Sequence, residues 1–207
     1  MLKTTIFSLL LALFHFCPLV AKPIDVFFGT GGRGAEGIYH ATFNPDNGRF
    51  SPAKLAAEIG SPGFLAHHPD GKKIYAVARW DKQAGAIGYQ VLPGGELEEF
   101  TRMACPDGGG AHIAVHPSGK FLFTAQYGGG SVALFPLDQD GKLGEPTVTE
   151  HQGGSKVVER RQESPHPHWC GFSPDGKFAL VPDLGLDQIV IYKVDEQKPA
   201  ITRHEVG

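Results

Sequence analysis

The sequence predicts an all-β fold made of repeated four-stranded sheets. Three stretches align without gaps around Pro69, Pro117 and Pro174, and each places an apolar run on both sides of a Pro-Asp-Gly or Pro-Ser-Gly turn. Proline presets φ for such a turn, and glycine takes the positive φ that other residues resist. The flanking runs are short and rich in Val, Ile, Phe and Tyr, which is typical of strands. Each unit therefore begins with a β-hairpin.

A third strand follows each hairpin, in GAIGYQVL, SVALFPL and DQIVIYKV, and a weaker fourth strand precedes the next unit. Four short antiparallel strands in a period of about 40–50 residues are typical of a β-propeller blade. A β-sandwich is the competing all-β arrangement, but it does not repeat the same turn in every unit. Residues 26–44 are predicted to form a blade entered partway through, and no helix is predicted in residues 22–207.

The chain contains about four blades, whereas propellers usually close with about four to eight. An open array would leave a blade face and a sheet edge uncovered. We therefore expect residues 22–207 to be the N-terminal part of a longer propeller. A closed four-bladed ring or a dimer of half-rings is the alternative. The second repeat interval is longer than the first because it contains the polar segment HQGGSKVVERRQES, a predicted loop insertion.

Residues 1–21 have the pattern of a secretory signal peptide. Lys3 precedes an apolar stretch that is too short for a stable membrane anchor, and Ala21 stands at a plausible cleavage position. We expect an exported protein, periplasmic or extracellular, with no membrane attachment after cleavage; a buried N-terminal helix is the alternative. Export would permit a disulfide between Cys105 and Cys170, which the sequence leaves open.

The composition is that of an ordinary soluble globular protein, with 207 residues, a formal charge of -3 and 41% hydrophobic residues. The absence of a basic block argues against a nucleic-acid partner. The interior of the chain has no apolar run long enough to span a bilayer. No pattern demands a cofactor, and the oligomeric state is not determined.

The phrases YGGGSVALFPL and SPHPHWCGFSPDG are specific, and the chain resembles the β-propeller lactonases from about Val26 to Asp195. These are 6-phosphogluconolactonase-like proteins with seven blades. The resemblance implies a seven-bladed propeller that hydrolyses a sugar-acid lactone. It also implies a relation to the carboxy-muconate lactonizing enzymes, in which a site histidine matches His168. The chain departs from the family at Ala78-Arg79, where Asn-Glu is usual, and at Pro167 and Trp169 beside the histidine pair.

His168 is the predicted acid/base catalyst, with His112, Arg161 and His166 as predicted substrate-binding residues. Lactone opening needs an activated water, a stabilised oxyanion and a proton for the leaving alkoxide. A histidine with a pKa of about 6.5 can supply the proton transfers, and an arginine can bind an anionic group or polarise the carbonyl. The alternative is a non-catalytic propeller that binds a ligand or protein on its rim.

The histidine pair is expected to begin an inner strand. Alternation along that strand would place His166, His168 and Cys170 on one face and Trp169 on the other. Such positions extend over about 13 Å, too far to converge on one tetrahedral ion, so no metal site is predicted. The alternative is that His166 and His168 bond to turn backbone and hold the start of the blade.

Several other polar residues are interpreted as structural. His68 and His116 occupy the same repeat position before the turn proline, so both are excluded from the site. Asp183 and Asp187 are interpreted as turn and blade-joining residues, because Asp side chains mimic a backbone turn; the alternative is that they face the ligand. The glycine-rich segment GTGGRGAEG is not followed by a helix, which argues against a nucleotide-binding loop.

Overall fold

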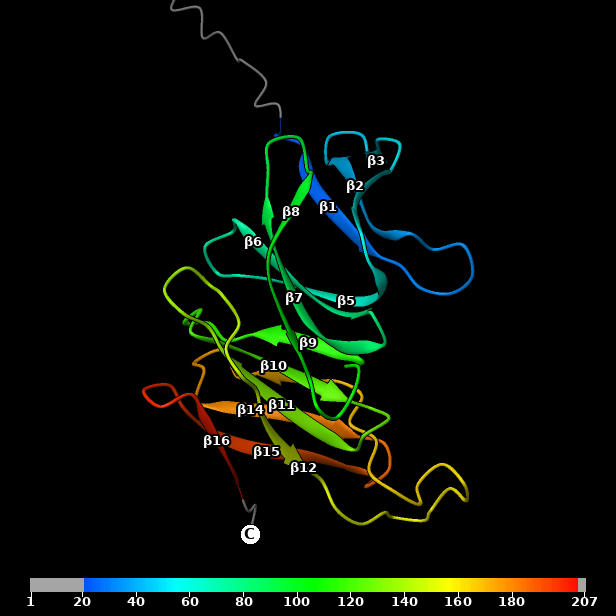
Figure 1. Ribbon diagram of the computed structural model, residues 1–207, viewed down its shortest axis with the longest axis vertical. Helices are drawn as coiled ribbons and strands as arrows, with labels where there is room; N and C mark the ends of the chain where they lie inside the picture. The colour runs from blue at the N-terminus through cyan, green and yellow to red at the C-terminus, as the bar shows by residue number, and fades with distance from the viewer. Residues whose placement is uncertain (1–20, 205–207) are drawn as a thin grey trace, which may run out of the picture.

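A computed structural model describes residues 21–204 as four antiparallel sheets stacked one after another along the long axis of the molecule (Figure 1). The predicted signal peptide, residues 1–21, lies outside the described residues except for Ala21. The described part of the chain contains strands and no helix, as predicted. It accordingly contains no helix with the length and apolar character needed to cross a bilayer.

The sixteen strands fall into four blades in chain order. The first two blades comprise β1 (Ile24–Gly29), β2 (Gly37–Asn44), β3 (Arg49–Phe50), β4 (Lys54–Glu58), β5 (Gly60–His67), β6 (Lys73–Trp80), β7 (Gln83–Val91) and β8 (Leu97–Ala104). The next two comprise β9 (His112–Val115), β10 (Phe121–Gln126), β11 (Ser131–Pro136), β12 (Thr147–Glu150), β13 (Gly171–Phe172), β14 (Phe178–Asp183), β15 (Gln188–Asp195) and β16 (Ala200–Arg203).

The strands of the second, third and fourth blades pair in sequence order. Contacts between blades join β5 to β9 and β9 to β13, so these end strands are the inner strands around the propeller axis. In the first blade β2 pairs with β1 on one side and successively with β3 and β4 on the other. β1 is the strand of this sheet with the most extensive contact to β5 of the second blade, and the partial first blade stays a prediction.

The turn glycines adopt the conformation that the repeat predicts. Gly71, Gly119 and Gly176 have φ of 69°, 72° and 71°, the left-handed region that L side chains resist. Each turn joins the first two strands of its blade, and the three hairpins therefore start with the same geometry. The polar insertion 151–164 contains no strand, as expected.

The blades pack through apolar side chains of alternating direction. In β10, Phe121 and Phe123 belong to the core shared with the fourth blade, whereas Leu122 belongs to the core shared with the second blade. All three are fully buried. Burying one such side chain contributes about 1.5–3 kcal/mol. A central blade is thus apolar on both faces, which explains the continuous rather than alternating apolar runs.

Histidine side chains link consecutive turns on one face of the stack. The Nε2 atom of His68 donates to the Gly119 carbonyl at 3.2 Å, and that of His116 donates to the Gly176 carbonyl at 2.9 Å. In each case Nδ1 accepts the backbone N–H two residues onward, from Asp70 or Ser118. Both histidines therefore join one blade to the next, which confirms their structural role.

The question of the cysteines is settled by their positions. Cys105 and Cys170 are both free and buried. The Cys105 sulfur accepts from Nε2 of Gln126 at 3.0 Å, and the Cys170 thiol donates to the Phe123 carbonyl at 3.3 Å. Burial raises the pKa of both thiols, so neither is a thiolate at neutral pH.

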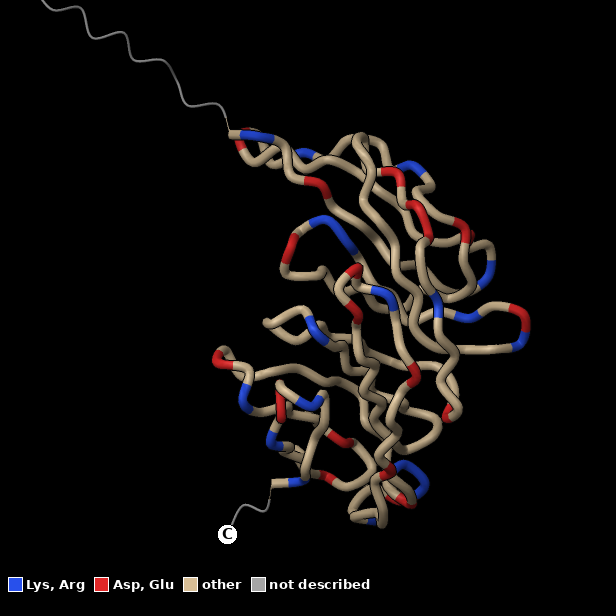
Figure 2. Tube along the Cα trace, turned by 60° about the vertical axis from the view of Figure 1, so that its left-hand side comes forward, with Lys and Arg blue, Asp and Glu red and all other residues tan. Residues whose placement is uncertain are grey.

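Charged residues of both signs are interspersed along the trace, mostly in loops and turns (Figure 2). In this view, acidic and basic residues are mixed along residues 21–204, and neither kind forms a long continuous segment. The strands that build the three interblade cores are largely free of charge, as the burial of β10 requires.

The His116 bond makes a measurable contribution to stability. We expect His116→Ala to lower the free energy of unfolding by about 1–3 kcal/mol, because the substitution leaves the buried Gly176 carbonyl without its donor. Urea denaturation measures this loss. The exposed His67, which lies beside the equivalent His68, provides a matched control, and His67→Ala should change stability by less than about 0.5 kcal/mol. Equal midpoints for the two variants would contradict the interblade role.

Candidate functional site

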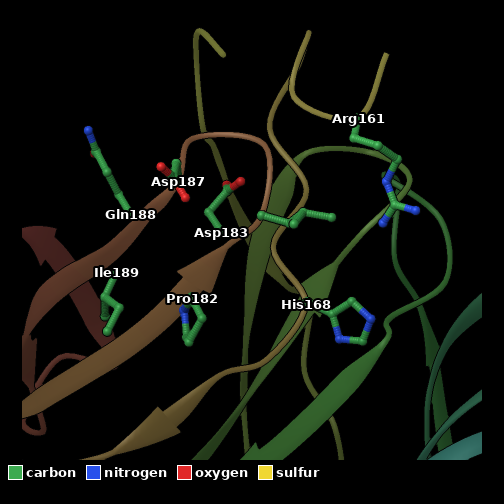
Figure 3. A pocket seen from close by; sticks show the side chains of 8 residues that line it. Arg161, His168, Pro182, Asp183, Asp187, Gln188 and Ile189 are labelled. Atoms are coloured by element: carbon green, nitrogen blue, oxygen red, sulfur yellow. The ribbon is translucent and has the colours of Figure 1, made fainter. Parts of the chain in front are cut away.

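An open pocket of about 620 Å³ lies beside the turn between β14 and β15. His168 and Arg161 lie on one side, whereas Asp187, Gln188 and Ile189 lie on the other (Figure 3). The structure thus brings together two of the four predicted site residues. They come from the segment between β12 and β13, which leads from one blade to the next.

His168 presents an exposed imidazole to this pocket. Its backbone N–H donates to the Pro182 carbonyl at 3.1 Å, which ties the residue to β14. Its ring stands nearly perpendicular to that of Tyr127, at 82° and 5.4 Å between centroids. The backbone is therefore held while the ring nitrogens are accessible, which is the arrangement that proton transfer to a bound molecule requires.

The expected inner strand begins later than predicted. β13 covers only Gly171–Phe172, and the histidine segment contributes one isolated bridge, between Pro167 and Asp183. The His168 N–H donates to the Pro182 carbonyl and the Leu184 N–H to the His166 carbonyl, on either side of the Pro167–Asp183 bridge, but the register shifts by one residue before Gly171 pairs with Leu180. The prediction that the pair starts the strand was wrong for this reason.

The expectation of a shared face was also wrong. His166 is half-buried against Tyr127, His168 is exposed, and Cys170 is buried against His112. Alternation applies only within a regular strand, which these residues do not form. Among residues 21–204, no group of three or more His, Cys, Asp or Glu side chains has the arrangement of a metal site.

His166 uses one ring nitrogen to hold the backbone. Its Nδ1 donates to the Tyr127 carbonyl at 2.9 Å, and its ring stacks on the Tyr127 ring at 4.6 Å. Its Nε2 lies 3.5 Å from the Ser164 hydroxyl, at the limit of a hydrogen bond. Only Nε2 is available to a ligand, so His166 serves first to fix the segment that carries His168.

Arg161 extends from the polar insertion toward Tyr127. Its Nη2 donates to the Tyr127 hydroxyl at 3.4 Å, and the rest of the guanidinium is exposed. The following Gln162 is only 3% exposed. Its Oε1 accepts from the Val158 N–H at 2.7 Å, and its Nε2 donates to the Leu184 carbonyl at 2.8 Å. Gln162 therefore anchors the insertion and places Arg161 over the pocket.

Tyr127 connects these residues and was missed by sequence reasoning. It contacts Arg161, His166 and His168 from the turn after β10, in the preceding blade. It is the first residue of YGGGSVALFPL, so the phrase that marks the family also contains it. Tyr127 and Arg161 are more than thirty positions apart in the chain, so a sequence pattern does not reveal that they are in contact.

A buried carboxylate holds the whole segment in place. Oδ1 of Asp183 accepts the N–H groups of His166, Gly185 and Leu186 at 2.7, 2.9 and 3.1 Å. Oδ2 accepts from Nδ1 of His151 at 2.6 Å. The prediction that Asp183 is a turn and blade-joining residue is confirmed, because His151 follows the last strand of the preceding blade.

The network ends at a tyrosine. Nε2 of His151 accepts from the Tyr192 hydroxyl at 2.7 Å, and the His151 and Asp183 side chains are 1% and 0% exposed. Burial acts to raise the pKa of Asp183, but the hydrogen bonds from His151, His166 and Leu186 outweigh it and hold the pKa below its ordinary value. Asp183 is therefore ionised at neutral pH and acts in positioning rather than in proton transfer.

His112 lies on the other side of the same segment. It begins β9, an inner strand as predicted, and is 6% exposed. Its Nδ1 accepts the Cys170 N–H at 3.4 Å, so the neutral ring carries its proton on Nε2. Burial, with a smaller effect of the nearby His168, lowers the pKa of His112 to about 4. At neutral pH it is a hydrogen-bond donor without charge.

Comparison with known proteins identifies the family to which this geometry belongs. The profile of the family described as "Lactonase, 7-bladed beta-propeller" matches residues 25–206. The chain belongs to this family. It is 33% identical over 164 residues to the 6-phosphogluconolactonase of Bacillus subtilis, covering 79% of this chain and 47% of that protein. The predicted seven-bladed type is thereby confirmed.

A second curated relative, the probable 6-phosphogluconolactonase of Arthroderma benhamiae, is 30% identical over 166 residues, covering 79% of this chain and 42% of that protein. The chain thus spans about half the length of the curated relatives it matches.

Two solved structures have the same fold over most of this chain. The putative 6-phosphogluconolactonase of Bacteroides fragilis is 29% identical, with a TM-score of 0.79 over 89% of this chain and 55% of that one. The periplasmic gluconolactonase PpgL of Pseudomonas aeruginosa is 27% identical, with a TM-score of 0.78 over 89% of this chain and 56% of that one.

The Asp183 network is sensitive to acid. Because its folded pKa is depressed, the stabilisation is complete above the unfolded value of about 3.9 and is lost as the pH falls through the folded pKa. Asp183→Asn, which cannot ionise, should cost on the order of 3 kcal/mol at pH 6. We expect this difference from the wild type to shrink below about pH 4, as measured by urea denaturation across pH. A difference that is constant with pH would contradict an ionised Asp183.

His112 should remain neutral where an ordinary histidine becomes charged. With a pKa of about 4, the ring nuclei of His112 are expected to show no titration between pH 7 and pH 5.5 in NMR spectra. His112→Gln identifies its resonances. A midpoint near pH 6.5 would show that the ring is not desolvated between the blades.

Proposed function

We propose that this chain supplies part of the active site of an enzyme that hydrolyses a sugar-acid lactone. The observation that carries the proposal is the exposed His168 imidazole beside Arg161 in an open pocket, in a chain of the lactonase family. Relatives named for 6-phosphogluconolactonase and gluconolactonase activity support the substrate class. Because the chain spans about half of these relatives, further residues of the site belong to the rest of the propeller.

In the proposed reaction, His168 takes a proton from the water that attacks the lactone carbonyl. The tetrahedral intermediate then collapses, the ring C–O bond breaks, and the imidazolium returns the proton to the leaving alkoxide. One lactone and one water thus give one hydroxy acid, and the histidine is regenerated. General acid–base assistance of this kind contributes about 10²–10⁴-fold.

Arg161 supplies the positive charge that the intermediate needs. Its guanidinium is tethered to Tyr127 by one nitrogen only, so its other N–H groups are available for the developing oxyanion or a substrate carboxylate. The Nε2 of His166, which lies 3.5 Å from the Ser164 hydroxyl, is suited to a substrate hydroxyl. The neutral His112, with Nε2–H as a donor, stands behind His168 and does not compete for its proton.

The proposed substrate is an unphosphorylated aldonolactone. The predicted signal peptide directs the protein out of the cytosol, where phosphorylated sugar lactones are made. Asp187 lines the pocket and the buried, ionised carboxylate of Asp183 lies behind it, against the single guanidinium of Arg161, which disfavours a dianionic phosphate. The similarity to a periplasmic gluconolactonase supports export.

His168→Ala tests the function and the site together. In the natural full-length protein we expect opening of δ-gluconolactone well above the uncatalysed rate, and a loss of about 10²–10⁴-fold in kcat for His168→Ala. A pH-stat records the acid released. His67 is the last residue of the inner strand β5, and the His67→Ala variant should retain full activity.

Two outcomes would overturn the proposal in different ways. A folded wild type that does not accelerate opening of the free or the 6-phosphorylated lactone leaves a propeller that binds a ligand or protein on its rim. Full activity in His168→Ala would instead place the acid/base elsewhere in the propeller.

A further inference from the structure

Three aromatic rings from three consecutive blades form a row along the inner strands. Phe64 is on β5, His112 begins β9, and Trp169 precedes β13. The Phe64 and His112 centroids are 3.9 Å apart, and those of His112 and Trp169 are 5.3 Å apart. We call these three residues the aromatic row. Its central ring is buried, whereas Phe64 and Trp169 are each 42% exposed.

The Trp169 indole is set in a fixed place by the residue beneath it. A Cβ atom on Gly171 would lie only 2.0 Å from Cη2 of Trp169 and 2.5 Å from Cζ2. The indole therefore lies directly against the backbone of the inner strand, in space that only glycine leaves open. One side of the ring system is covered by Gly171 and His112, and the remaining surface faces solvent.

The exposed indole is adjacent to the proposed catalytic side chain. Trp169 follows His168 in the chain. The His112 ring centroid is 5.3 Å from that of Trp169. The charge of a protonated His168 also acts to lower the pKa of His112, so His112 is close to both residues. The row itself carries no charge at neutral pH, because the burial of His112 keeps its imidazole neutral. A flat, uncharged aromatic surface thus lies one residue along the chain from His168, and the His112 ring is near both side chains.

We propose that Trp169 is the surface on which the sugar ring of the lactone stacks, and this rests on the proposed lactonase function. The ring of an aldonolactone has a face of C–H bonds with weak positive polarisation, which complements the negative face of an indole. Its hydroxyl groups then point outward from the ring, toward the polar side chains of His166 and Arg161. An apolar wall with few directed polar groups is the usual construction of a small-molecule site.

This role differs from that of a packing residue. Trp169 is not a member of the three buried cores. It is a specificity-determining residue that acts on substrate binding, whereas His168 acts on the chemical step. The two roles predict opposite kinetic signatures.

Steady-state kinetics on δ-gluconolactone, with the natural full-length protein, measure the first signature. We expect Trp169→Leu to raise KM about tenfold with kcat changed by less than about threefold, because stacking is lost but the proton transfers are not. Trp169→Phe, which keeps a flat ring, should raise KM by about threefold or less. Equal KM for wild type, Phe and Leu variants would overturn the stacking role.

Fluorescence provides a second measurement that does not depend on activity or on the stability of the Leu variant. The probe is D-glucono-1,5-lactam, a sugar lactam that resists hydrolysis. We expect a saturable change in tryptophan emission in the wild type and in Trp80→Phe, and none in Trp169→Phe. Trp80 is a suitable control because it lies on β6, under the Arg102 guanidinium at 5.3 Å.

The outcomes separate the two proposals. Lactone hydrolysis with no Trp169 dependence in either measurement overturns the stacking role alone. No hydrolysis by the wild type, with a lactam response that requires Trp169, overturns the lactonase and leaves a sugar-binding propeller. Absence of both hydrolysis and a lactam response overturns both.

Discussion

The buried carboxylate of Asp183 is the interaction on which the arrangement of the site depends. A single side chain accepts three backbone N–H groups and one imidazole N–H, and it thereby joins three separate parts of the chain. A buried charge is tolerated only when it is fully paired and hydrogen-bonded, so each partner is obligatory rather than optional. The turn after β14, the end of the third blade and the histidine segment are therefore fixed relative to one another.

The third and fourth blades are consequently linked at both ends of their strands. The bond from His116 to Gly176 joins the turns between first and second strands, and the pair of His151 and Asp183 joins the opposite ends. The apolar core between these blades lies between the two polar links. Apolar packing alone is not directional, and the two links set how far one sheet rotates against the next. The polar insertion 151–164 can therefore extend away from the blades while the third and fourth blades stay packed against each other.

The same links explain why His168 is exposed. The histidine segment pairs with β14 only at the Pro167–Asp183 bridge, so it would be free to move without the bonds to Asp183, Tyr127 and Pro182. These bonds use the backbone and the His166 ring, and they leave the His168 ring uncommitted. A precisely held backbone with an accessible imidazole is what positions an acid/base group for a reaction. The site therefore lies in an irregular segment before β13, and the regular strands around that segment hold it in place.

The repeat and its turns could be predicted from the sequence alone, as could the approximate place of each inner strand. The Pro-Asp-Gly and Pro-Ser-Gly turns need glycine at positive φ and strands on both sides, which are local requirements that Gly71, Gly119 and Gly176 meet. Because the blades repeat, the structural role of His68 and His116 could be read from their common position. Asp183 could be recognised as a turn residue for the same local reason.

Only the tertiary structure decided which polar residues share a site. The shared face predicted for His166, His168 and Cys170 assumed a regular strand, and the one-residue register shift before Gly171 removed that regularity. Tyr127 and His151 reach the site region through contacts between blades, and the separations along the chain are too long for any spacing rule. A repeat predicts what is common to the blades, whereas this site is built where one blade departs from the others.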